Sequence, residues 1–115
     1  MKDPRIDKLA DILVNYATRL QPGEKLLLED RGINRELAVA IINKAYQAGG
    51  LPAVQLYDAQ VDRALMQGYT KEQLDWLAGL DAKRMSDCAA YIAVRGGDNV
   101  YETADVSDAQ KRLYS

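Results

Sequence analysis

The feature that most constrains the fold is the alternation of short apolar segments with longer amphipathic ones. The short segments, at residues 25–29, 53–57 and 89–94, have the length and turn-rich borders of β-strands. The segments between them carry apolar residues at three- and four-residue steps, which predicts helices. Helices between successive strands favour parallel pairing with right-handed crossovers. The sequence therefore predicts an α/β fold of three layers, in which a short parallel sheet of about three strands has helices on both faces.

Capping residues set the expected starts of the helices. Asp3 before Pro4 predicts a first helix that reaches residue 20, with Tyr16 on its buried stripe. A second helix is expected over residues 35–48. Asp58 is placed to cap a short third helix, and Thr70 opens a capping box before a fourth. These helices would cover the sheet.

Strand order follows from how apolar each strand is. The run Leu26–Leu28 does not alternate, as expected of a central strand that is covered on both faces. Gln55 alternates with apolar neighbours, which favours an edge strand, so the expected order is 2-1-3. The third strand is too apolar for an exposed edge. One interpretation is a small domain with a frayed tail. The favoured one is a fragment whose third strand has its neighbour outside this chain.

Composition excludes several classes of protein. Lys and Arg number 15 against 17 Asp and Glu, a net charge of −2, without the basic excess of a nucleic-acid-binding module. No apolar run approaches the roughly 20 residues of a membrane span, and the first residues lack a signal-peptide pattern. Cys88 is the single cysteine, so an intrachain disulfide is impossible and a cytoplasmic location is expected.

The chain contains no histidine, which limits its chemistry most. A Ser-His-Asp triad, a Cys-His dyad and an imidazole-bound zinc are excluded within these 115 residues. A metal site here would have to be built from oxygen ligands. No catalytic residue and no metal ligand is assigned to this chain.

Candidate ligand-facing residues follow the carboxyl ends of the strands, where parallel sheets bind ligands. They are Asp30 and Arg31 after the first strand, Asp58 after the second, and Asp98 after the third. The acidic side chains would suit Mg²⁺, although Asp routinely serves as a cap or turn residue instead. Both interpretations remain open.

The loop after the third strand is the other candidate. It contains Arg95, Gly96, Gly97, Asp98 and Asn99. Successive glycines let backbone N–H groups converge on an anion, and the arginine would add positive charge. The pattern is neither a dinucleotide fingerprint nor a P-loop, and a turn beneath a partner surface is the alternative.

Four stretches of the sequence resemble the thermophilic metallo-aminopeptidases, the group of aminopeptidase T, AmpS and PepS. They are residues 3–10 (DPRIDKLA), 20–25 (LQPGEK), 45–50 (AYQAGG) and 90–99 (AYIAVRGGDN). They occur in collinear order over essentially the whole chain. Each stretch is common on its own, and it is their combination that is specific.

The resemblance implies cytosolic, two-domain, dimeric enzymes that remove N-terminal residues from peptides. It also implies two divalent metal ions of the Zn, Co or Mg class, held by ligands in the C-terminal half, and none of those ligands maps onto this sequence. Residues 1–115 would then be a single non-catalytic N-terminal domain, inactive alone, with a structural and subunit-contact role. Its partners would be its own C-terminal domain and a second copy, while peptide substrate, but neither nucleic acid nor membrane, would belong to the parent.

Two other hypotheses stay open beside this one. The first is a stand-alone binding module that holds an anion or Mg²⁺ at the carboxyl edge of the sheet. The second is a self-associating domain in which the exposed third strand pairs with a neighbouring chain.

Overall fold

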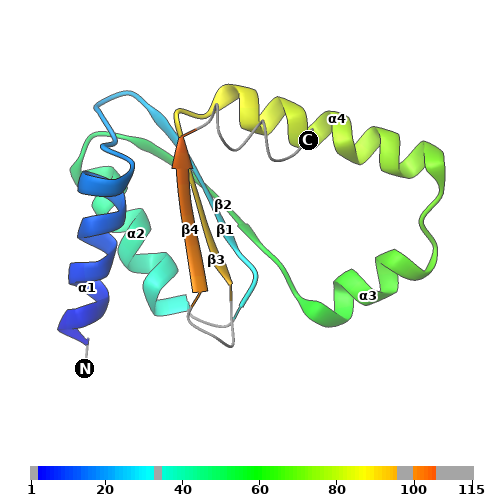
Figure 1. Cartoon of the computed structure of the whole chain (residues 1–115), viewed down its shortest axis with the longest axis horizontal. Coiled ribbons are helices and arrows are strands. Elements are labelled where there is room, and N and C mark those ends of the chain that lie inside the picture. Colours follow the sequence, from blue (N-terminus) through cyan, green and yellow to red (C-terminus); the bar gives the residue numbers. More distant parts are fainter. Residues whose placement is uncertain (1–2, 33–34, 96–99, 106–115) are drawn as a thin grey trace.

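The structure, a computed structural model, describes residues 3–32, 35–95 and 100–105. Helices and strands alternate along the chain (Figure 1). The helices are α1 (Pro4–Asp11), the π-helix η1 (Ile12–Ala17), α2 (Arg35–Gln47), α3 (Ala59–Gln67) and α4 (Lys71–Asp87). The strands are β1 (Lys25–Asp30), β2 (Leu51–Leu56), β3 (Ala90–Arg95) and β4 (Val100–Asp105).

The strands form one sheet in the order β2-β1-β3-β4. β1 pairs in parallel with both β2 and β3, so that Leu28 lies between Val54 and Ile92. The predicted α/β class and the 2-1-3 order of parallel strands are confirmed. The central position of β1 agrees with its burial, because three consecutive leucines are covered by protein on both faces of the strand.

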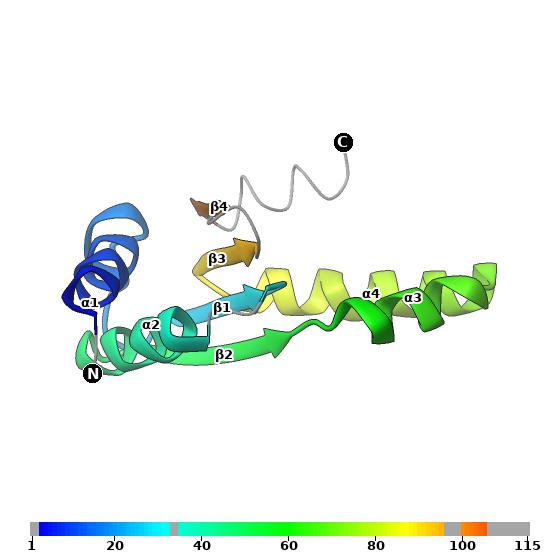
Figure 2. The same cartoon turned by 90° about the horizontal axis from the view of Figure 1, so that it is seen from below.

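The expectation that the third strand lacks a neighbour within this chain is wrong. β4 pairs antiparallel with β3 and brings Val100 opposite Arg95 and Asp105 opposite Ala90. The sheet therefore has a fourth strand, and its two edge strands are β2 and β4 (Figure 2). The sequence hid β4 because residues 100–105 (VYETAD) mix polar and apolar residues, and their pairing depends on β3.

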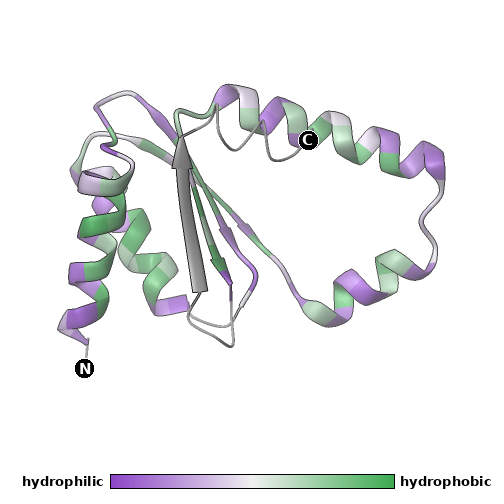
Figure 3. Cartoon of the chain, in the orientation of Figure 1, coloured by the Kyte–Doolittle hydropathy of each residue, from purple (hydrophilic) through white to green (hydrophobic). Residues whose placement is uncertain are grey.

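The main hydrophobic core lies between the sheet and the helices α1, η1 and α2. Leu26, Leu28 and Ile92 point from the sheet toward Val14 and Ile41, and all five are essentially inaccessible to solvent. Burying a side chain of this size stabilises the fold by about 1.5–3 kcal/mol. In Figure 3 the hydrophobic parts of α1 and α2 lie toward each other and the sheet. This side of the molecule holds the fold together.

The first helix differs from the prediction in its second half. After Asp11 the hydrogen bonds lengthen to the π pattern, and the Thr18 N–H donates to the Leu13 carbonyl at 3.1 Å. The Thr18 hydroxyl also donates to the Leu13 carbonyl, at 3.0 Å, and Arg19 takes a positive φ of 51°. Tyr16 consequently points outward and is 68% exposed, against the expectation that it lies on the buried stripe.

The opposite face of the sheet is covered only in part. Leu27 packs there with Met85 and the buried Cys88, beside Tyr91. Burial raises the pKa of the Cys88 thiol, which fits a structural thiol. Helices α3 and α4, here called the arm, extend away from the sheet (Figures 1 and 2). None of the described helices is both long and apolar enough to cross a membrane.

The arm exposes most of its apolar side chains. Every residue of α3 is at least partly exposed, and Met85 is the one buried residue of α4. Trp76 is 65% exposed. The other large apolar residues exposed on the arm or at its bend are Val61, Leu65, Met66, Tyr69, Leu74 and Leu80.

Candidate functional site

The carboxyl ends of β1, β2 and β3 meet at one edge of the sheet, as the sequence predicted. The Tyr57 N–H donates to the Asp30 carbonyl at 2.9 Å, and the Arg31 N–H donates to the Val94 carbonyl at 2.7 Å. These two bonds extend the strand pairing by one residue beyond β2 and by one residue beyond β1. Tyr57, after β2, is therefore held to β1, and Arg31, after β1, is held to β3.

Asp30 is the only charged side chain that is fully buried in the described part of the chain, at 1% exposure. Its Oδ1 accepts a 3.0 Å hydrogen bond from the Gly32 N–H. Its Oδ2 is also buried and has no hydrogen-bond partner among the described residues. A buried acceptor left unpaired costs about 1–3 kcal/mol, more when it is charged. Chemically, this oxygen can accept an N–H or O–H donor or a cation.

A second polar group lies on the other face of the same edge. Tyr91 donates a 2.9 Å hydrogen bond from its hydroxyl to Oε2 of Glu29. Arg31 places Nη2 3.7 Å from the same oxygen, and its guanidinium lies 3.9 Å from the centre of the Tyr57 ring. The cation therefore interacts with a carboxylate and an aromatic face together. Side chains of β1 and β3 are joined in this way to those of the residues that directly follow β1 and β2.

The environment of the two tyrosines makes them weaker acids than usual. Burial is the main cause that raises the pKa of Tyr91, and the charge of Glu29 and the hydrogen bond to it add to the effect. Burial also raises the pKa of Tyr57, again with the charge of Glu29 as the second cause. Both phenols therefore stay neutral at physiological pH and act as hydrogen-bonding groups.

Sequence reasoning missed the roles of Tyr57 and Tyr91. The signal for them was the two-residue period of strands, which places Glu29, Gln55 and Tyr91 on one face of the sheet. Gln55 has its side-chain Oε1 buried without a partner among the described residues.

Asp58 serves as a helix cap. Its Oδ1 accepts hydrogen bonds from the N–H groups of Gln60, at 2.9 Å, and Val61, at 3.1 Å, and the residue is exposed. Of the two interpretations of Asp58, the structure supports the cap. Asp30 and Asp58 therefore have separate roles, and no group of three or more His, Cys, Asp or Glu side chains in the described residues could hold a metal ion.

The glycine-rich loop stays a prediction. Arg95 is the exposed last residue of β3. Gly96, Gly97, Asp98 and Asn99 lie outside the described residues.

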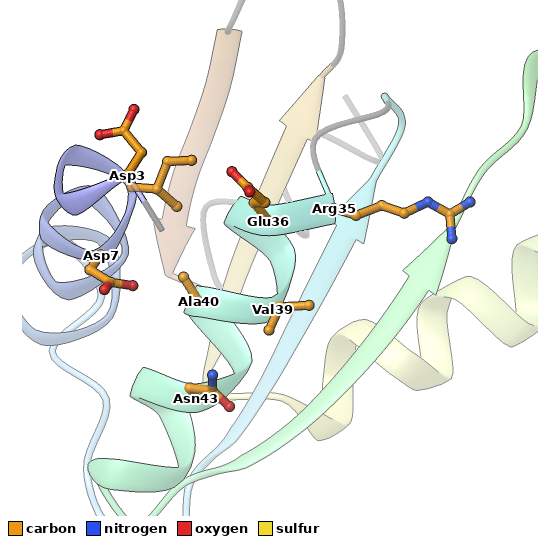
Figure 4. A pocket seen from close by; sticks show the side chains of 8 residues that line it. Asp3, Asp7, Arg35, Glu36, Val39, Ala40 and Asn43 are labelled. Carbon is orange, nitrogen blue, oxygen red and sulfur yellow. The ribbon is translucent and has the colours of Figure 1, made fainter. Parts of the chain in front are cut away.

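A hollow of about 280 Å³ lies between α1 and α2, away from this edge (Figure 4). Its acidic side chains are Asp3, Asp7 and Glu36, while Arg35 points away from α1, in the direction of β1 and β2. The carboxylate of Asp3 accepts hydrogen bonds from the backbone and side-chain N–H groups of Arg5, at 2.9–3.2 Å. The side-chain hydrogen bond from Arg5 is the main cause that lowers the pKa of Asp3.

Comparison with known proteins identifies the family. The model of the thermophilic metalloprotease (M29) family matches residues 2–113. A search of curated proteins found no match. Among solved structures, wild-type AmpT from Thermus thermophilus is similar, with 25% sequence identity and a TM-score of 0.65. The similarity covers 83% of this chain and 25% of the AmpT chain, so this chain spans about a quarter of the length of that protein. The resemblance found in the sequence is confirmed: the chain belongs to the thermophilic metalloprotease (M29) family, a family of metal-dependent peptide hydrolases.

Proposed function

We propose that this chain is the N-terminal, non-catalytic domain of a cytoplasmic metal-dependent aminopeptidase, which removes N-terminal residues from peptides. The family match over residues 2–113 is the observation that carries the proposal. The similarity to a quarter of the AmpT chain supports it, because a full-length protein of that size would contain a further part that could carry the catalytic residues.

The donor atoms of this chain do not fit the pair of divalent metal ions that the family implies. The sequence offers no histidine and one cysteine, and that cysteine is buried at the C-terminal end of α4. The described carboxylates do not gather into a group of three. No step of peptide hydrolysis is therefore derived from these residues, and the proposed role is structural.

The arm is the part of the domain that we expect to contact the rest of a full-length enzyme. A helix that is not packed in its own domain is held by little more than its caps and ion pairs. Those of the arm are the caps at Asp58 and Thr70 and the ion pairs Lys71–Asp75, Arg84–Asp81 and Lys83–Asp87. Apart from Met85, its apolar residues lie outside the two buried clusters described above. A docked catalytic domain would bury them, and subunit contacts are the other part of the proposed role.

The proposal is tested by assaying the purified 115-residue chain for release of N-terminal residues from short peptides, with Zn²⁺, Co²⁺ or Mg²⁺ added. The expected result is no turnover above buffer. Turnover that a chelator abolishes and that copurifies with the chain would contradict it.

The alternative function is a stand-alone module that binds Mg²⁺ or an anion at the carboxyl edge. Its support is the unpaired Oδ2 of Asp30, which favours the cation. A binding module predicts that Mg²⁺ raises the melting temperature of the chain and that Asp30→Asn removes the rise. A melting temperature that neither Mg²⁺ nor phosphate changes would contradict the binding module and would favour the aminopeptidase domain.

A further inference from the structure

The hollow between α1 and α2 has an apolar floor that the fold holds in place. Ile6 lines it from α1, and Val39 and Ala40 line it from α2 (Figure 4). Ala40 belongs to the main core and Ile6 packs against that core, whereas Val39 is 52% exposed. The volume of about 280 Å³ is close to the lower end of the range of ligand pockets, which is about 300–1,000 Å³. A hollow of this size suits a single amino-acid residue or a small molecule.

The charge at the hollow is negative. Asp7 lines it from α1 and Glu36 lines it from α2. Among the ion pairs and hydrogen bonds of the described residues, none involves either of these two side chains. Asp3 is paired with Arg5, and Arg35 points away from α1 (Figure 4). The N-terminal ends of the two helices add only about half a positive charge each, so two carboxylates outweigh them.

The ligand that fits this combination is an organic cation with an apolar body. Mg²⁺ and Ca²⁺ take about six or more oxygen ligands, which two carboxylates above an apolar floor do not supply. A primary ammonium needs only acceptors, and ionised carboxylates are acceptors only. The apolar floor would at the same time remove an aliphatic side chain of the ligand from water.

We propose that this hollow binds the N-terminal residue of a peptide, with its α-ammonium beside Asp7 and Glu36 and an apolar side chain against Ile6 and Val39. The spacing of the lining residues favours this ligand over a lysine side chain. Asp7 follows Ile6 directly, and Glu36 lies one helical turn before Val39, so charge and apolar surface are adjacent on each wall. In an N-terminal residue the ammonium and the side chain share one carbon, whereas the ammonium of lysine lies at the far end of its apolar stem.

Such a site would be a second, non-catalytic contact for peptides in the full-length protein. The inference rests on the proposed function only for the source of the peptide, because the geometry of the hollow is independent of any catalytic residue. Binding to this chain is measured without turnover. Chelator-sensitive peptidase activity of the chain would overturn the proposed function and leave the binding results as they stand, so the two proposals can fail separately.

The first test compares four small ligands. The isotope-labelled 115-residue chain is titrated with leucine amide, glycine amide, N-acetyl-leucine amide and N-acetyl-lysine amide, and backbone amide shifts are followed by NMR. Leucine amide is expected to shift the signals of α1 and of the first half of α2 in a saturable way. Glycine amide lacks the apolar side chain and N-acetyl-leucine amide lacks the ammonium, so both are expected to bind more weakly, by about fivefold or more.

The second test changes the carboxylates without changing their size. Asp7→Asn and Glu36→Gln are each expected to weaken leucine amide about twofold to fivefold, the range of an exposed ion pair. Glu72→Gln is the matched control, because Glu72 is also an exposed glutamate in the first turn of a helix, α4, and it does not line the hollow. It is expected to leave the affinity unchanged.

Three results would overturn the proposal. The first is the absence of a saturable shift at about 10 mM leucine amide, which means a free energy of binding weaker than about −3 kcal/mol. The second is equal binding of N-acetyl-leucine amide, which would show that the ammonium is not recognised. The third is tighter binding of N-acetyl-lysine amide, which would assign the hollow to lysine side chains instead of peptide N-termini.

Discussion

Tyr91 on β3 donates a 2.9 Å hydrogen bond to Glu29 on β1, next to the carboxyl edge of the sheet. Tyr91 is half-buried, and Glu29 also forms an ion pair with Arg31. The carboxylate of Glu29 therefore connects two strands and the residue after β1. The polar group on this face is thus organised around Glu29.

Removing this hydroxyl is expected to destabilise the fold. Tyr91→Phe keeps the ring and deletes the donor, which should lower the free energy of unfolding by about 1–2 kcal/mol because the acceptor is charged. Urea denaturation measures the loss. Tyr46→Phe, at a residue that is 64% exposed, is the matched control and should change the stability little. Equal effects of the two changes would show that the Tyr91–Glu29 bond contributes nothing.

The same tyrosine predicts a dependence of stability on alkaline pH. Its pKa is raised in the folded chain, chiefly by burial, so the unfolded state loses the phenolic proton first as the pH rises. The contribution of Tyr91 is therefore fully present below about pH 10, the ordinary pKa of tyrosine, and is lost as the pH rises through the higher folded value. Unfolding free energies measured from pH 8 to 11 should fall at the alkaline end, and less steeply for Tyr91→Phe. Parallel curves for the two proteins would contradict the assignment.

The cap at Asp58 predicts a local effect. Asp58→Ala removes the acceptor for the Gln60 and Val61 N–H groups and should cost α3 about 1 kcal/mol. Because α3 lies outside the core, the loss should appear as faster amide exchange over residues 59–67 while the urea midpoint of the sheet changes little. Asp62→Ala, in the same helical turn but without a capping bond, is the control. A similar increase in exchange for both variants would indicate that charge near the helix start, and not the cap, stabilises α3.

A comparison of Gly23 with Gly49 can distinguish the cost of backbone strain from the cost of a steric clash. Gly23 and Gly49 both have φ near 82°, where an L side chain is strained. A Cβ at Gly23 would meet nothing within 4 Å, whereas a Cβ at Gly49 would lie 3.1 Å from Cβ of Pro22. Gly23→Ala should cost about 1 kcal/mol from the backbone alone, and Gly49→Ala should cost more. Thermal unfolding of the two variants measures the difference, and a larger loss at Gly23 would contradict the geometry.

The sequence predicts the parallel part of the fold because the evidence for it is local. The leucines of β1, the edge character of Gln55 and the caps at Asp3, Asp58 and Thr70 are each visible in a few residues, and each is confirmed. Strand β4 and the π-helix were missed because both depend on neighbours: β4 on pairing with β3, and η1 on Thr18 and the turn after it. The arm was expected to cover the sheet because its apolar stripe follows helical spacing. Spacing shows that a stripe exists, and the structure shows that this one faces solvent.

The sequence predicted where Asp30 and Arg31 lie in the fold, while their role in binding a ligand stays a prediction. A parallel sheet places Asp30 and Arg31 at the edge where the carboxyl ends of its strands lie, and the structure has both residues there. The contact of Arg31 with Tyr57 and the unpaired oxygen of Asp30 depend on side-chain directions that spacing does not give.

The central claim is that this domain belongs to a metallopeptidase and yet holds none of its metal. Equilibrium dialysis of the purified chain against micromolar Zn²⁺ or Co²⁺, followed by elemental analysis, measures this directly. The account predicts no stoichiometric uptake, because the described side chains offer no set of ligands and the sequence has no histidine. Tight binding of a pair of ions by each chain would contradict it.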